Sequence, residues 1–63
     1  MGEKLMEYYE YMNERDGLKG KMELAKATNL PSTKASTAED SEENVQLLRE
    51  AIQEITGERP PRL

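Results

Sequence analysis

The chain contains no cysteine, histidine, phenylalanine or tryptophan in its 63 residues. Without cysteine there are no disulfide bonds, and without histidine as well the common ligands of zinc are missing. The same two absences leave no cysteine or histidine to act as a nucleophile or as a near-neutral base. No phosphate-binding loop, dinucleotide-binding glycine pattern or calcium loop is present. We therefore expect no enzyme and no metal or cofactor.

Large apolar side chains are also scarce, because the sequence offers only three Tyr and four Met beside its aliphatic residues. A chain of this length buries only about 60% of the surface that its unfolded form exposes, so its stability alone should be marginal. Small domains of this kind are often stabilised by disulfides, a metal, an unusually dense core or a partner subunit. With the first two excluded, we expect a homodimer or a complex with another protein.

The formal net charge is −4, and charged residues make up 35% of the chain. A net negative charge disfavours nonspecific binding to nucleic acids and to acidic membranes. No apolar run approaches the roughly 18 residues that a membrane span needs. The first residues also lack the apolar centre of a secretory signal. The expected location is the cytoplasm, with no membrane partner.

The clearest pattern is a helix over about residues 41–56. Asp40 is expected as its N-cap, with Glu43 completing a capping box, and Gly57 as its C-terminal stop. Its apolar residues recur at spacings of three and four and therefore form one stripe along the helix. They are Val45, Leu48, Ile52 and Ile55. This stripe predicts that the preceding part of the chain folds over the helix.

Two further helices are predicted over about residues 3–15 and 18–29. Gly17 separates them and suits a left-handed backbone position, while Pro31 prevents the second from continuing. The segment 32–38 is either a loop or a short additional helix, because Ser and Thr compete with helical hydrogen bonds. The fold class is therefore all-α, a small bundle of three to four helices.

We expect a single helical domain over residues 1–57, followed by an extended, flexible Pro-rich tail over 58–63. The expected core takes one apolar face from each helix. Its members are Leu5, Tyr8, Tyr9, Met12, Leu18, Met22, Ala25, Leu30, Val45, Leu48, Ile52 and Ile55.

The leading hypothesis for function is a noncatalytic protein–protein interaction or regulatory module. Apolar side chains in excess of a small core are typical of a binding surface. The candidates for a partner interface are Met6, Tyr8, Tyr9, Tyr11 and Leu47. A ridge of carboxylates along the first helix is either a solvated face or a docking surface for a basic partner. The ridge comprises Glu3, Glu7, Glu10 and Glu14.

Residues 24–38 resemble a helix-turn-helix motif. Ala25 occupies the small position where the two helices cross, Asn29 occupies the turn, and Ala35 faces inward from the second helix. The resemblance implies DNA binding through the second helix and neighbouring lysines. The implied residues are Lys19, Lys21, Lys26, Ser32, Thr33, Lys34 and Ser36. DNA binding is the alternative hypothesis, because the second helix contains no Arg, Asn or Gln for base contacts and is followed by an acidic stretch over 39–43 that would repel phosphates.

Overall fold

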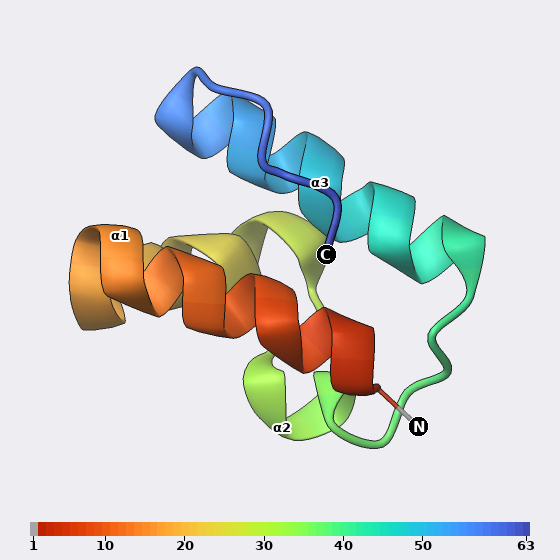
Figure 1. The fold of residues 1–63 in the computed structure, drawn as a ribbon. Coiled ribbons are helices and arrows are strands. Elements are labelled where there is room, and N and C mark those ends of the chain that lie inside the picture. The colour runs from red at the N-terminus through yellow and green to blue at the C-terminus, as the bar shows by residue number, and fades with distance from the viewer. Residues whose placement is uncertain (1) are drawn as a thin grey trace.

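The computed structural model describes residues 2–63 and contains three helices (Figure 1). They are α1 (Glu3–Thr28), α2 (Ser32–Ala35) and α3 (Glu42–Thr56). Helix α1 packs against both α3 and α2. The described residues contain no strand, so the all-α bundle expected from the sequence is confirmed.

Helix α1 consists of two helical segments that fold back on each other at Gly17 (Figure 1). Gly17 has φ 68° and ψ −155°, a combination that only glycine adopts readily. The segments, residues 3–16 and 18–28, match the two helices predicted over 3–15 and 18–29. The reversal at Gly17 therefore makes the two segments of α1 separate helices in space.

The start of α3 differs from the capping box expected from the sequence. The N-cap is Ser41, whose Oγ accepts a hydrogen bond from the backbone N–H of Asn44 at 3.2 Å. Glu43 is then the second helical residue, one position short of the capping-box position. Glu42 and Glu43 nevertheless lie in the first turn, where carboxylates oppose the positive end of the helix dipole. The predicted end at Gly57 is confirmed by its left-handed conformation.

Asp40, expected to cap α3, instead caps the beginning of α1. Its Oδ1 accepts hydrogen bonds from the backbone N–H groups of Lys4 at 3.2 Å and Leu5 at 3.3 Å. These N–H groups belong to the first turn of a helix, where no intrahelical carbonyl can reach them. The contact joins residues 35 and 36 positions apart, and therefore depends on the fold rather than on local sequence.

The core lies between α3, α2 and the two segments of α1. Its buried apolar members are Leu5, Tyr8, Tyr9, Met12, Leu24, Ala35, Val45, Leu48 and Ile52. Ala25, Leu30 and Ile55, all expected in the core, are half-buried. The prediction was wrong for Leu18 and Met22, which are 68% and 53% exposed.

These errors share one cause, because segment 18–28 turns a different side to the core from the one expected. The expected side carried Leu18 and Met22, whereas the buried side carries Gly20, Leu24 and Thr28. A Cβ atom at Gly20 would lie 2.7 Å from Asp16 Cβ, so the missing side chain permits close packing at the reversal. The Thr28 hydroxyl donates to the Leu24 carbonyl at 2.8 Å, which satisfies its polar group inside the bundle.

Helix α2 is a single helical turn after Pro31. Asn29 ends α1 at the expected turn, and its φ of 54° and ψ of 27° are left-handed. Ala35 is buried, also as expected. Of the segment 32–38, only Ser32–Ala35 is helical, and Ser36 and Thr37 bond back to Thr33 and Lys34 through their hydroxyls.

The tail after Gly57 is extended and runs back along α3 towards α1 (Figure 1). Pro60 is fully buried, and Arg49 Nη2 donates to its carbonyl at 3.0 Å. The Leu63 N–H donates to the Tyr8 hydroxyl at 3.2 Å, and Arg62 pairs with Glu42 at 2.9 Å. These contacts give the tail defined positions on two helices; its flexibility stays a prediction.

Candidate interaction surface

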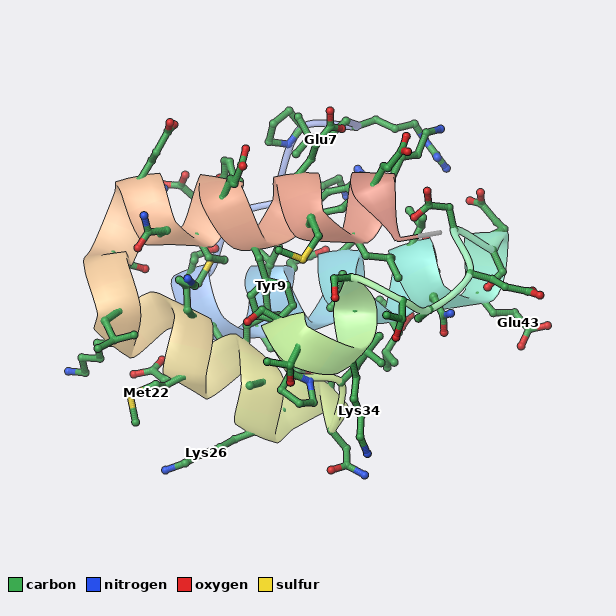
Figure 2. All side chains as sticks on the ribbon, turned by 90° about the horizontal axis from the view of Figure 1, so that it is seen from below. Glu7, Tyr9, Met22, Lys26, Lys34 and Glu43 are labelled. Carbon is green, nitrogen blue, oxygen red and sulfur yellow. The ribbon has the colours of Figure 1, made fainter. Side chains whose placement is uncertain are left out.

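Two of the five expected interface residues provide no surface. Tyr8 is 0% and Tyr9 1% exposed, so both belong to the core alone, and Figure 2 shows Tyr9 between the helices. Their hydroxyls bind backbone atoms: Tyr9 donates to the Leu30 carbonyl, and Tyr8 accepts from Leu63. The aromatic rings therefore hold the bundle together and leave nothing for a partner to contact.

The other three candidates are at least partly accessible. Met6 and Tyr11 are half-buried and pack against the core, whereas Leu47 on α3 is 41% exposed. Met6 and Tyr11 lie on the first segment of α1 and Leu47 lies on α3, so these residues come from two elements rather than one stripe. Leu47 alone is a large exposed apolar residue among the five.

The two most exposed large apolar side chains of residues 2–63, Leu18 and Met22, lie instead on segment 18–28. Leu18 and Met22 are one helical turn apart, so their side chains share a face. Lys19 and Lys26 are exposed beside them, and Glu23 is the only acidic residue of the segment. We call Leu18, Lys19, Met22 and Lys26 the basic apolar face. Met22 and Lys26 project from the same side of the molecule in Figure 2.

The basic apolar face was missed because its pattern is that of a core stripe. Apolar residues at positions 18, 22 and 25 indicate a buried helix face by periodicity alone. Two signals argue against that interpretation. Lysines flank the stripe, and the opposite side of the helix carries the small residues Gly20 and Thr28, which permit close packing. A face that is apolar in the middle and basic at its margin is typical of a binding surface.

A second exposed face, on α3, has the opposite charge. Glu43, Leu47, Glu50 and Glu54 recur at spacings of four, three and four, and all four side chains are exposed. A surface hollow of about 440 Å³ lies over Leu47. It is lined by Glu42, Glu43, Gln46, Leu47 and Glu50, with no basic side chain. We call Glu43, Leu47, Glu50 and Glu54 the acidic apolar face.

The carboxylate ridge of the first helix also lies on the surface. Glu3, Glu7, Glu10 and Glu14 are all exposed, and Glu7 projects away from Met22 and Lys26 in Figure 2. A hollow of about 410 Å³ is lined by three of these carboxylates together with Tyr11 and Leu63. Within residues 2–63, no group of three or more acidic, histidine or cysteine side chains is arranged to hold a metal ion.

One acidic residue at the margin of the α3 hollow already has a partner. Arg62 Nη2 donates to Glu42 Oε1 at 2.9 Å. This hydrogen bond, together with the positive charge of Arg62, lowers the pKa of Glu42 below its ordinary value. Glu42 is therefore bound to the tail. Of the three carboxylates that line the hollow, Glu43 and Glu50 remain available to a basic group of a partner.

The residues of the helix-turn-helix alternative lie on segment 18–28 of α1, on α2 and, for Ser36, directly after α2. Lys19, Lys26, Thr33, Lys34 and Ser36 are exposed, while Lys21 and Ser32 are half-buried. The second helix of the motif is α2, with four residues. A recognition helix places several side chains on base edges along the major groove, which one turn does not provide. The lysines remain available for phosphate contacts.

Comparisons with protein families, with curated proteins and with solved structures found no match to this chain. Among the helices of residues 2–63, none combines the length and the apolar character that crossing a membrane requires.

Proposed function

We propose that the chain is a noncatalytic interaction module whose partner binds the basic apolar face. The observation that carries this proposal is the 68% exposure of Leu18 and the 53% exposure of Met22 on one helix face. Two neighbouring apolar side chains in water lose the free energy that burial would give, about 1.5–3 kcal/mol for each when buried completely. A partner that covers both recovers part of that free energy.

The flanking lysines support the same surface. The face carries two exposed positive charges, Lys19 and Lys26, and Glu23 is the one acidic residue of segment 18–28. Charges at the margin of an apolar contact steer association and select the orientation of the partner. The proposed partner therefore presents apolar side chains beside carboxylates.

A photo-crosslinking amino acid at position 22 tests this function in living cells. We expect covalent protein adducts from position 22, and their loss when Leu18→Asp is added to the same chain. The matched control places the crosslinker at Ala27, which is exposed on the other side of the same segment. Equal adducts from positions 22 and 27, or none from position 22, would overturn the proposal.

DNA binding is the second candidate, and the exposure of Lys19, Lys26 and Lys34 supports it. Lys26 and Lys34 project from the same side of the molecule (Figure 2). Contacts of this kind are made to phosphates, so affinity would fall steeply as salt is raised. Titration of labelled duplex DNA at low salt tests this function; an unchanged anisotropy at the highest protein concentration would exclude it.

A further inference from the structure

The chain carries two exposed faces of opposite charge, each built around an apolar centre. The basic apolar face carries two exposed positive charges, Lys19 and Lys26. The acidic apolar face carries three exposed negative charges, Glu43, Glu50 and Glu54, whereas Glu42 on the same helix is already paired with Arg62. Leu18, Met22 and Leu47 are the large apolar side chains that are exposed within residues 2–63, and these two faces contain all three.

We propose that the basic apolar face of one copy binds the acidic apolar face of a second copy. The inference rests on the proposed function, because it identifies the partner of the same face. Complementary charge and an uncovered apolar centre on each side are the features that a specific interface requires. This chain supplies both halves of such an interface.

The spacing of the charges matches across the two faces. Lys19 and Lys26 are seven residues apart on one helix, as are Glu43 and Glu50 on the other. At 1.5 Å per residue, each pair spans about 10.5 Å along its helix axis. Met22 lies between the two lysines, and Leu47 lies between the two glutamates. Two helices laid side by side can therefore join both charge pairs while the apolar residues meet in the middle.

The resulting contact is heterologous, because it joins two different faces. Every pair of copies then leaves one basic and one acidic face unoccupied, so association continues beyond the dimer unless a ring closes. A stable interface buries about 800 Å² on each partner, close to a fifth of the 4183 Å² of surface of this chain. Two helix-sized faces provide less than that, so we expect weak association that grows with protein concentration.

Two variants that each block one face provide the test. Met22→Glu places a carboxylate in the basic apolar face, opposite the glutamates of the second copy. Leu47→Lys places an ammonium group in the acidic apolar face, opposite the lysines. Both positions are exposed, so neither change disturbs the core. The measurement is weight-average mass by light scattering over a concentration series at low salt.

We expect the unchanged chain to exceed twice the monomer mass at high concentration. Each variant alone should remain monomeric, because it retains only one of the two faces. An equimolar mixture of the variants should stop at a one-to-one dimer, since the intact face of each binds the intact face of the other. Ala27→Glu introduces the negative charge and Thr37→Lys the positive charge at exposed positions that belong to neither face, and both should associate like the unchanged chain.

The proposal is overturned if the unchanged chain is monomeric throughout, if either variant still associates, or if the mixture stays monomeric. Its failure can be distinguished from failure of the proposed function. A monomeric chain that still forms adducts from position 22 with a different protein would retain the function and exclude the second copy. A monomeric chain without such adducts would exclude both.

Discussion

Two tyrosine hydroxyls tie the first segment of α1 to distant parts of the chain. Tyr9 donates to the carbonyl of Leu30 in the turn before α2, and Tyr8 accepts from the N–H of Leu63 at the end of the tail. A buried polar group that loses its partner costs about 1–3 kcal/mol. Each tyrosine therefore combines a buried ring with a hydrogen bond that fixes the position of another segment.

Replacement of Tyr9 by phenylalanine should lower the free energy of unfolding by about 1 kcal/mol. The ring stays in place, but the Leu30 carbonyl loses the hydroxyl that donates to it. Urea unfolding followed by circular dichroism measures the difference. Tyr11→Phe is the matched control, because Tyr11 is only half-buried. An equal loss in both variants would contradict a specific role for the Tyr9 hydroxyl.

Tyr9 should also make the free energy of unfolding depend on pH. Burial raises the pKa of Tyr9, against a smaller opposing effect of the nearby Thr28 hydroxyl. A pKa that is higher in the folded than in the unfolded state gives stability that is fully present below the unfolded value of about 10. This stability is lost as the pH rises through the folded value. The stability advantage of the unchanged chain over Tyr9→Phe should therefore shrink above about pH 10; a constant difference would contradict the burial effect.

At the scale of the elements, the sequence predicted where every long helix lies along the chain. It did not predict which side of segment 18–28 faces the core. Helix α3 was predicted correctly because its apolar residues lie on one side and its other side is strongly charged. Segment 18–28 has apolar residues on two sides, Leu18 and Met22 on one and Leu24 on another. Periodicity favoured the side with more of them. In the folded chain the side with Gly20 faces the core, because the small size of Gly20 allows close approach to the preceding segment.

Residues of the candidate surface could be predicted from the sequence only if their exposure does not depend on how segment 18–28 is oriented. Leu47 was identified from the sequence because it lies outside the apolar stripe of α3, and it is exposed. Leu18 and Met22 could not be identified, since their exposure follows from the packing of Gly20 and Thr28. Capping shows the same division: Ser41 and Asp40 are equally good N-cap residues, and only the folded chain brings Asp40 to Lys4 and Leu5.

The two adjacent caps allow a direct comparison. Asp40→Ala should destabilise the protein by about 1 kcal/mol, as should Ser41→Ala, because each removes the cap of one helix. Their local effects should differ: hydrogen exchange should accelerate at Lys4 and Leu5 in the first variant and at Asn44 in the second. Faster exchange at Asn44 in Asp40→Ala, with Lys4 unchanged, would return Asp40 to the role expected from the sequence.

The reversal at Gly17 should not tolerate an L-amino acid. Gly17→Ala should cost about 1–3 kcal/mol, because alanine at φ 68° and ψ −155° is strained. A Cβ atom there would meet nothing within 4 Å, so the loss comes from backbone strain rather than from a clash. D-Alanine in a synthetic chain is the matched control, since it favours the mirror-image backbone region. Equal losses for the two enantiomers, measured by thermal unfolding, would contradict the strain argument.

At the scale of the whole molecule, the tail closes the bundle. Pro60 is fully buried, and the backbone around it is bound by Arg49 on α3 and by Tyr8 on α1. A chain of 63 residues has little core to spare, so six residues that cover two helices form a substantial part of its packing. Arg62 adds an exposed ion pair with Glu42, of the kind that contributes little to stability.

Removal of residues 58–63 should therefore lower the free energy of unfolding by about 2 kcal/mol, the scale of one fully buried apolar side chain. Urea unfolding of the truncated and complete chains measures the loss, and Pro60→Ala should reproduce part of it. Arg62→Gln is the control, because it removes the exposed ion pair while Pro60 stays buried, and it should leave the stability nearly unchanged. Equal stability of the truncated and complete chains would instead support the flexible tail predicted from the sequence, and would mean that the helices alone form the folded unit.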